Sequence, residues 1–274
     1  MHSILPIEDL DIPEMEPYLT MRRLEQHRLQ GIFVAEGDKV VHRLIKSHFG
    51  VESLLVLPER LEEFKEALRV RKEAVNIYVA AKAILEKLTG YSMYQGVLAI
   101  GLIPSPVPLE DLISMAKPNP LFAALDGVMN SENVGALIRN AAAFGLDGVI
   151  VGETCCSPYL RRAVRNSMGG IFKVPVVESL DLTASMRRLK ARGIRCVAAH
   201  PGAHQKPLVD TELRGGTCLI FGSEGYGISE RTLELCDSHA AISMRHGIDS
   251  LNVASAAGVF FYEATRQRLV ERIP

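Results

Sequence analysis

The second half of the chain alternates short, nearly continuous apolar segments with stretches of helical spacing. Apolar runs separated by helices are typical of a parallel sheet that is covered on both faces. A long final helix is expected from about Leu251 to Leu269. Ligands of such sheets bind at the carboxyl ends of the strands, so the polar residues that follow them are candidates for a site. The expected strands are LFAALDG, GVIVG, IFKVPVV, IRCVAAH, TCLIFG and AAISM.

The first hundred residues predict a separate, smaller α/β domain. The segment FVAEGDKVVHRLIKSHFG indicates a strand, a turn and a helix, and VESLLVL, VNIYVA and QGVLAIGLI are further strands with helices between them. The segment IPSPVPLEDLISMAKPNP then contains five prolines in eighteen residues, a composition suited to an ordered linker. We therefore expect an N-terminal domain in residues 1–104, a linker in 105–119 and the parallel-sheet domain in 120–274.

Composition narrows the class of protein further. An apolar fraction of 47% in 274 residues supports proper cores and argues against disorder. No apolar run reaches bilayer-spanning length, and the acidic N-terminus does not resemble a signal peptide, so no membrane is expected. The five cysteines are an odd number and two are adjacent, which does not indicate a disulfide framework. We expect a protein of the reducing cytoplasm.

The net charge of −1 says little about partners, but its distribution says more. Residues 154–209 contain ten Lys or Arg against two acids, and residues 21–48 contain six against three. Such asymmetry is the footprint of a surface that binds a polyanion. Solvated helix faces explain the same pattern, so both interpretations remain open.

The segment LIFGSEGYGISE, residues 219–230, carries the clearest signal of a site. Leu219, Ile220 and Phe221 end a buried strand, and three glycines with one carboxylate, Glu224, follow at once. Glycines cluster where the backbone needs positive φ or approaches a ligand closely. A strand-to-helix turn that needs tight geometry is the simpler alternative. We expect Tyr226 to be a buried anchor of the loop rather than a platform for a base.

Two further segments combine polar residues with the ends of strands. In LDGVMNSENVGALIRNAAAFG, Asn133 is expected to cap a helix, and Arg139 lies off the apolar stripe between small neighbours that leave room for a ligand. In AISMRHGIDSLNVASAAGVFFYE, Ser250 or Asn252 is expected to cap the final helix, whose free N–H groups suit an anionic or polar ligand.

Metal and dinucleotide sites are less well supported. Cys196, His200 and His204 have the spacing of metal ligands on a helix, but Pro201 and Gly202 break that helix. The loop FGSEGYG does not open the fold as a strand–GxGxxG–helix unit, so it is not a dinucleotide fingerprint. We expect no metal.

In this order, NVGALIRNAAAFG, FGSEGYGIS and SLNVASAAG resemble the three signature motifs of the SpoU (TrmH) family, RNA ribose methyltransferases of the SPOUT superfamily that use S-adenosylmethionine. The resemblance covers residues 120–268, and CSPYLRRAVRNSMGGIFKVPV is similar to the family's connecting segment. FVAEGDKVV and YQGVLAI are similar to the substrate-binding domain, related to a ribosomal protein, of many members. The resemblance implies a trefoil knot and a homodimer whose active site draws on both subunits.

The resemblance also assigns roles to residues. It implies that the methyl donor lies at Gly222, Ile242 and Leu251, with Ile220 and Met244 beside them. The implied catalytic residues are Arg139, Asn133, Glu224, Ser250 and Asn252. The usual Thr after the arginine is Asn140 here, and the usual Pro before Met244 is Ser243.

This assignment makes physical sense for methyl transfer to a ribose 2′-OH. A fixed positive group near the oxygen in a water-poor pocket lowers the barrier. Arg139 fits that role better than the role of general base, because a guanidinium hardly ever loses a proton. A backbone phosphate, Glu224 or water is left as the proton acceptor.

Ribosomal RNA is expected rather than tRNA as substrate, because the chain lacks the long basic C-terminal extension of some tRNA-specific members. The alternatives are a tRNA 2′-O-methyltransferase and a catalytically silent relative that binds RNA. A nucleotide-binding α/β protein of unrelated chemistry is a more distant one.

Overall fold

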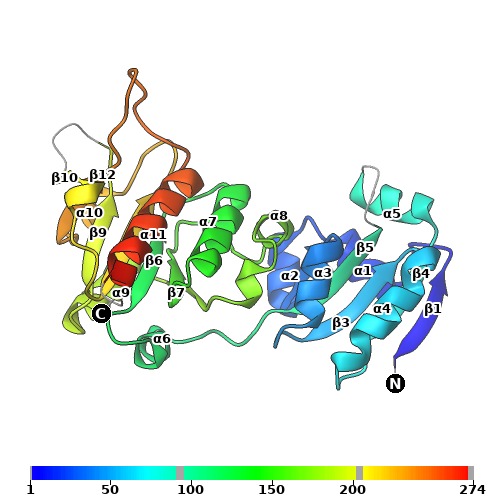
Figure 1. The fold of residues 1–274 in the computed structure, drawn as a ribbon. Coiled ribbons are helices and arrows are strands. Elements are labelled where there is room, and N and C mark those ends of the chain that lie inside the picture. Colours follow the sequence, from blue (N-terminus) through cyan, green and yellow to red (C-terminus); the bar gives the residue numbers. More distant parts are fainter. Residues whose placement is uncertain (1, 91–95, 202–205, 271–274) are drawn as a thin grey trace. The chain divides into compact units, whose positions relative to one another are not determined.

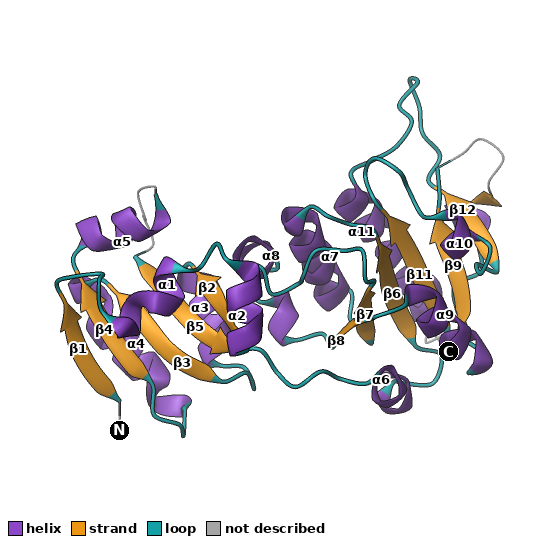
Figure 2. Cartoon of the chain, turned by 180° about the vertical axis from the view of Figure 1, so that it is seen from behind, coloured by secondary structure: helices purple, strands orange, loops and turns teal. Residues whose placement is uncertain are grey.

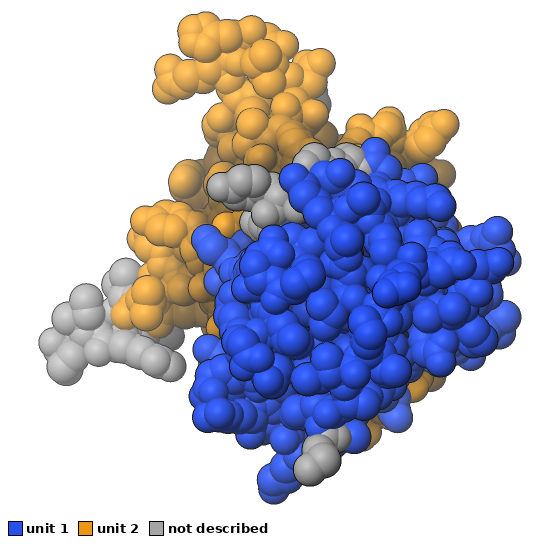
Figure 3. Space-filling view, turned by 90° about the vertical axis from the view of Figure 1, so that its right-hand side faces the viewer, with its two compact units in different colours: residues 1–105, 159–172 blue, residues 106–158, 173–274 orange. Residues whose placement is uncertain are grey.

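The computed structural model describes residues 2–90, 96–201 and 206–270. The chain divides into two compact units, coloured separately in Figure 3. The N-terminal unit contains Met1–Ser105 together with Tyr159–Phe172, and the C-terminal unit contains Pro106–Pro158 together with Lys173–Pro274. The chain therefore passes from one unit to the other three times. Among the described residues, no helix has the length and hydrophobicity needed to cross a bilayer.

The N-terminal unit is built on a mixed sheet with the strand order β1-β4-β3-β5-β2 (Figure 1). Parallel pairing joins β1, β4 and β3, while β5 runs antiparallel to both β3 and β2. Its strands are β1 (Ser3–Ile7), β2 (Ile32–Glu36), β3 (Val51–Val56), β4 (Asn76–Ala80) and β5 (Val97–Leu102). Its helices are α1 (Glu16–Leu19), α2 (Leu24–Gln30), α3 (Asp38–Ile45), α4 (Leu61–Ala67), α5 (Lys82–Thr89) and α8 (Arg161–Asn166).

The expected strand, turn and helix at residues 32–45 are confirmed, and their chemistry explains them. Gly37 has φ +94°, a conformation that favours glycine, and it turns β2 directly into α3. Four apolar residues of α3 are buried and its polar residues face outward. The strand β1 lies in the acidic N-terminal stretch and was not expected. Tyr94 and Gln95, which carry part of the resemblance to the substrate-binding domain, lie outside the described residues.

The segment Tyr159–Phe172 packs within the N-terminal unit although it lies far along the sequence. Its helix α8 packs on β2 (Figure 2). The rings at its two ends, Tyr159 and Phe172, lie 5.9 and 6.0 Å from the buried ring of Phe33 on β2. Hydrophobic burial at both ends of the segment therefore holds it on the N-terminal sheet.

The C-terminal unit has a parallel sheet with the order β10-β12-β9-β11-β6-β7-β8 in its described residues (Figure 2). The strands are β6 (Leu121–Asp126), β7 (Gly148–Val151), β8 (Val176–Glu178), β9 (Arg195–Ala199), β10 (Lys206–Pro207), β11 (Thr217–Gly222) and β12 (Ser238–Ala241). The helices are α6 (Leu109–Met115), α7 (Ser131–Ala143), α9 (Leu182–Ala191), α10 (Glu230–Leu233) and α11 (Val253–Val270).

The strand order explains where a ligand can enter. From β6 the chain adds β7 and β8 on one side, and it then returns to build β9, β11 and β12 on the other. The order therefore reverses between β6 and β11. Ligands of parallel sheets bind at such a switch point, beyond the carboxyl ends of the strands. Asp126 and Gly222 are paired there as the last residues of the two strands.

Alternation along β11 decides which side chains face which layer. Cys218 and Ile220 pack with α6 and α9 in one core cluster. Phe221 points to the other face, where its ring lies 5.7 Å from Phe260 and 5.5 Å from Phe261 of α11. This period of two is that of a strand with both faces covered.

Several predicted boundaries were wrong or incomplete. The expected strand IFKVPVV is a strand only in Val176–Glu178, because Gly170–Phe172 form a 3-10 turn in the N-terminal unit. The strand expected at AAISM ends at Ala241. The proline-rich linker contains α6, whose Leu109 and Leu112 are buried in the core of the C-terminal unit.

Candidate functional site

A cavity of about 610 Å³ opens at the carboxyl ends of β9, β11 and β12. Its walls come from the ends of these strands, from the loop Ser223–Gly227 and from the start of α11. Of the predicted residues, the cavity is lined by Gly222, Glu224, Ile242, Met244, Ser250, Leu251 and Asn252. The structure therefore brings residues from two separate motifs to one cavity.

The loop Ser223–Gly227 closes on itself by backbone hydrogen bonds. Ser223 N donates to Gly227 O at 2.9 Å, and Gly227 N donates to Ser223 O at 3.0 Å. Gly227 has φ +70°. A Cβ at Gly222 would collide with the backbone of Gly227 and Ile228, so glycine is required for this close approach. The loop is therefore both a tight turn that requires glycine and a wall of a cavity, so the two interpretations of the sequence are compatible.

The position of Tyr226 differs from the prediction. Its side chain is 98% exposed at the tip of the loop, so it is not a buried anchor. Its backbone N–H donates to Ser223 Oγ at 3.0 Å, which orients the tip outward. The same loop also lines a second cavity of about 410 Å³, whose other walls include Asp126, Thr154 and Arg231.

Asp126 is a structural residue of the site that the sequence reasoning missed. Its carboxylate is buried and accepts hydrogen bonds from Ser229 N at 2.8 Å and Ser229 Oγ at 2.7 Å. These bonds tie the end of β6 to the segment that follows the glycine loop. The sequence did contain a signal for it, since Asp126 is a single acid at the end of an otherwise apolar strand.

The start of α7 corrects one prediction. Asn130, and not Asn133, is the N-cap, because its Oδ1 accepts hydrogen bonds from the backbone N–H groups of Glu132 and Asn133. The Asn133 side chain is therefore available for other contacts. At the other helix, Asn252 is the cap as expected, since its Oδ1 accepts from Ala254 N at 3.0 Å and Ser255 N at 3.3 Å.

A chain of side-chain hydrogen bonds joins the three motifs at the mouth of the cavity. Asn252 Nδ2 donates to Asn133 Oδ1 at 3.0 Å, and Asn133 Nδ2 donates to Glu224 Oε1. Each asparagine uses its amide in a fixed orientation, so the Glu224 carboxylate is held at the rim. This arrangement is a polar, pre-oriented edge on an otherwise mostly apolar cavity.

Three predicted residues lie outside the lining of this cavity. Asn133 is joined to it by its hydrogen bonds to Glu224 and Asn252, whereas Ile220 and Arg139 lie elsewhere. Ile220 is fully buried and faces α6 and α9, the opposite side of the sheet from Phe221. Arg139 is exposed on α7, and no described residue forms a hydrogen bond or ion pair with its side chain. Arg139 follows Asn133 by six residues, which rotates it by roughly 120° to another face of the helix.

The neighbours of Arg139 hold α7 against α11. Asn140 Nδ2 donates to the carbonyl of Ala254 at 2.8 Å, and Gly258 leaves room for this amide. The departure from the usual Thr at residue 140 is therefore used in helix packing. The rings of Phe144 and Tyr262 lie 6.5 Å apart on the same pair of helices.

Thiols near the site are not poised as nucleophiles. Burial raises the pKa of Cys155 and that of Cys156 to about 11 each. Cys155 Sγ donates to the carbonyl of Leu125 and accepts from Val128 N, at 3.3 Å in each case. Both thiols therefore stay protonated near neutral pH and support packing.

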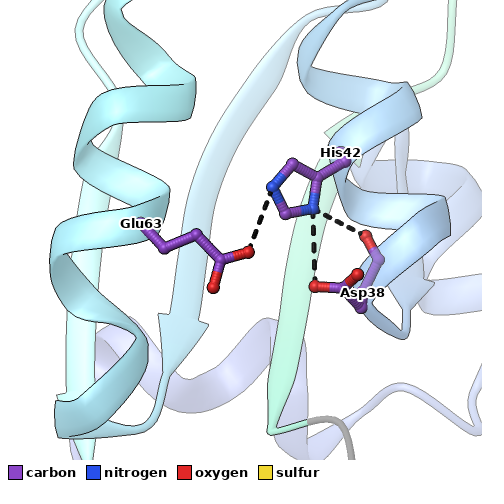
Figure 4. Close-up of side chains that lie close together, drawn as sticks. All are labelled: Asp38, His42 and Glu63. Atoms are coloured by element: carbon purple, nitrogen blue, oxygen red, sulfur yellow. Dashed lines mark hydrogen bonds and ion pairs between the residues drawn. The ribbon is translucent and has the colours of Figure 1, made fainter.

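Asp38, His42 and Glu63 are a group of described residues whose ligand atoms lie within 4.8 Å of one another in the N-terminal unit (Figure 4). Arg60 donates to the carboxylates of both Asp38 and Glu63, and its guanidinium lies 5.3 Å from the ring of Phe64. Both carboxylates therefore bind a guanidinium, and the group is part of an ion-pair network. His204, part of the discounted metal spacing, lies outside the described residues.

Comparisons with known proteins agree on one family. The model of the SpoU rRNA Methylase family matches residues 120–262, and that of the MRM3-like substrate binding domain matches residues 19–99. An uncharacterised tRNA/rRNA methyltransferase of Mycobacterium tuberculosis is 33% identical over 94% of this chain and 90% of that protein. A 23S rRNA (guanosine-2′-O-)-methyltransferase of Pseudomonas aeruginosa is 37% identical over 64% of this chain and 72% of that protein.

Solved structures show the same fold over nearly the whole chain. The SpoU methyltransferase AviRb from Streptomyces viridochromogenes, in complex with the cofactor AdoMet, matches with a TM-score of 0.81 and 25% identity over 94% of this chain and 98% of that chain. An AdoMet-bound rRNA methyltransferase from Sinorhizobium meliloti has a TM-score of 0.84 at 23% identity, over 96% of this chain and 98% of that one.

Proposed function

The chain belongs to the SpoU rRNA methylase family, and we propose that it transfers a methyl group from S-adenosylmethionine to a ribose 2′-OH of ribosomal RNA. The observation that carries this proposal is the cavity at the carboxyl ends of β9, β11 and β12, which is lined by residues of two signature motifs and joined by hydrogen bonds to the third. Its volume of about 610 Å³ suits a nucleoside-sized cofactor.

The residues present fit S-adenosylmethionine, which supplies a methyl group on a sulfonium when bound. Gly222, Ile242, Met244 and Leu251 would hold it with backbone groups and apolar side chains. The close approach at Gly222 keeps this part of the cavity open to backbone contacts, which a side chain there would block. Ile220 lies on the same strand two residues before Gly222 and would act indirectly, by packing that strand against α6 and α9.

The rim residues would orient the ribose and remove its proton. The transfer forms an oxygen–carbon bond, breaks the carbon–sulfur bond and releases the hydroxyl proton. Glu224 is the only carboxylate among the described residues that line this cavity, and Asn133 fixes its position. We assign Glu224 as the proton acceptor, with Ser250 and Asn252 holding the substrate edge of the cavity.

Arg139 is proposed to stabilise the negative charge that develops on the ribose oxygen, in the cavity of a second subunit. Within one chain it points away from the face of α7 that carries Asn133. A homodimer formed through α7 and α11 would bring it to the partner's site. The exposed apolar side chains of Val259 and Tyr262 on α11, 39% and 57% exposed, support such an interface.

The remaining features of the proposal concern the whole enzyme. We infer that residues 1–104 bind the substrate, that 105–119 connect the domains and that 120–274 carry the transfer. We also infer that the loops around β11 and β12 form the trefoil knot of the superfamily. The cytoplasm, where ribosomal RNA is modified, suits a chain whose five cysteines are all free thiols.

A transfer assay tests the proposal directly. Purified protein and tritiated S-adenosylmethionine are incubated with deproteinised ribosomal RNA or with tRNA, and ribose methylation is mapped by alkaline resistance of the modified bond. We expect incorporation into ribosomal RNA. Substitution Arg139→Ala should lower kcat by about 10²–10³-fold and leave the Kd for S-adenosylmethionine unchanged.

Two results of this assay would change the assignment. Incorporation confined to tRNA would replace the substrate class and keep the chemistry. Absence of incorporation into either RNA, with RNA binding retained, would favour a catalytically silent relative. The hydrogen-bond chain Asn252–Asn133–Glu224 argues against that alternative, because it holds a carboxylate in a fixed orientation at the cavity, where it can accept a proton.

A further inference from the structure

Two basic stretches that are far apart in the sequence come together within the N-terminal unit. The exposed face of α3 carries Lys39, Arg43 and Lys46, which follow one another at spacings of four and three residues and so form one row. The helix α8 adds the exposed Arg162 and Arg165, and beside them the mostly buried Arg161, from the segment that packs on β2. This set of six side chains is called the α3–α8 surface below.

A specific hydrogen bond and a required glycine hold the two rows together. The guanidinium of Arg43 donates to the carbonyl of Met168, just after α8. Gly169 has φ +75°, and a Cβ there would lie 2.7 Å from Arg43 Cδ. Glycine is therefore needed at this turn, both for its backbone conformation and to let Arg43 approach.

Few carboxylates balance this accumulation of positive charge. Glu36, at the end of β2, is 5% exposed and meets Arg161 at 3.3 Å and Arg165 at 2.8 Å, one carboxylate between two guanidinium groups. The acid of α3, Asp38, lies beside His42 (Figure 4) and also pairs with Arg60. Like charges gathered in this way repel one another, and a polyanion that binds them relieves the repulsion.

We propose that the α3–α8 surface binds the sugar–phosphate backbone of the RNA substrate. The inference rests on the proposed function. It specifies which surface holds the parts of the RNA that lie away from the target nucleotide. Lysine and arginine side chains that neutralise phosphates supply affinity and orientation without reading the sequence. The helix α8 lies in the segment matched by the methylase family model, so the surface combines residues of both matched regions.

A triple substitution tests the surface without touching its internal contacts. Lys39→Gln, Lys46→Gln and Arg162→Gln remove three charges from exposed side chains, and they leave the Arg43 and Glu36 contacts in place. The matched control removes the same charge elsewhere on the N-terminal unit, by Arg69→Gln, Lys72→Gln and Lys82→Gln. These three exposed residues flank β4, which is separated in the sheet from the edge strand β2 by β3 and β5.

Binding to deproteinised ribosomal RNA is measured by filter retention at several KCl concentrations. We expect the triple variant to bind roughly tenfold or more weakly near 0.1 M salt, and its slope of log K against log salt to fall by about two to three. The control variant should keep the affinity and slope of the wild type to within about twofold. Equal weakening in both variants, or wild-type binding by the triple variant, would overturn the proposal.

A second readout separates this inference from the assignment of the enzyme. Calorimetry should give both variants the wild-type Kd for S-adenosylmethionine, because none of the six positions lies in the cofactor cavity. Under turnover, the triple variant should show a raised KM for RNA and an unchanged kcat. If the protein methylates no RNA, the filter assay still decides whether this surface binds RNA.

Discussion

At the scale of single residues, the site depends on positions where only one type of residue fits. The sequence predicted that the glycines of FGSEGYG shape a ligand site, and Gly222 shows the cause, since any Cβ there meets the backbone of residues 227 and 228. The cap of α7 could not be predicted in the same way. Asn130, Ser131 and Asn133 are all good caps, and the loop geometry decides between them.

Substitution Gly222→Ala tests this requirement. The added methyl group must displace the loop Ser223–Gly227, which lines the cofactor cavity, so we expect the Kd for S-adenosylmethionine to rise by at least about tenfold and stability to fall by about 1–3 kcal/mol. Calorimetry and urea denaturation measure the two effects. Gly225→Ala is the control in the same loop, because nothing lies within 4 Å of its added Cβ. Equal effects at both glycines would contradict the explanation.

At the scale of elements, apolar patterning predicted the sheets well and the connections less well. Runs such as LFAALD and TCLIFG became β6 and β11 because a strand covered on both faces must be apolar throughout. The run IFKVPVV was wrongly predicted to be one strand, because Ile171 and Phe172 are buried within the N-terminal unit and are not part of a strand. Burial in a different unit produces the same apolar pattern, so periodicity cannot distinguish the two.

The docking of α8 gives a prediction about Glu36. Glu36→Gln keeps the shape of the side chain but removes the charge that faces Arg161 and Arg165. Arg161, whose side chain is only 12% exposed, then keeps its charge beside a neutral amide, so we expect the free energy of unfolding to fall by about 3–5 kcal/mol. Urea denaturation followed by fluorescence or circular dichroism measures it. Glu62→Gln, at an 81% exposed side chain paired with Lys65, should change stability by less than about 1 kcal/mol. If Glu36→Gln cost no more stability than Glu62→Gln, the idea that Glu36 holds α8 on β2 through Arg161 and Arg165 would be wrong.

The C-terminal half of α11 gives a prediction about pH. Hydrogen bonds from Arg266 and Gln267 lower the pKa of Glu263, and Gln267 in turn bonds the backbone of Thr211 and Leu213. A lowered pKa means that the ionised form stabilises the folded state at neutral pH, and that this stability is lost as the pH falls through the folded-state pKa. The wild type should therefore lose more stability than Glu263→Gln between roughly pH 5 and pH 3. Parallel curves of Tm against pH would show that the carboxylate has no such role.

At the scale of the whole molecule, the role proposed for Arg139 requires a second subunit. Its exposed position on α7 and its rotation away from Asn133 make a second subunit the expected partner. The resemblance to the family predicted a shared active site, whereas spacing in the sequence predicted only an arginine with room around it. Apolar periodicity indicates which side chains of a chain are buried, but not which exposed surface contacts a second copy, so spacing alone could not predict a shared site.

Complementation between two inactive variants tests the shared site. Subunits with Arg139→Ala keep an intact cofactor cavity, and subunits with Gly222→Ala keep the arginine, so a heterodimer holds one complete site if Arg139 acts across the interface. Differently tagged subunits are co-expressed, and the heterodimer is isolated through both tags. Activity is measured with S-adenosylmethionine well below its wild-type Kd, where we expect about half of the wild-type activity per heterodimer and about a tenth or less from either variant alone. If Arg139 acted within its own chain, each site of the heterodimer would lack one component and the mixture would stay inactive. Sedimentation of each preparation confirms that the compared species are dimers, so a lost interface is not mistaken for a lost residue.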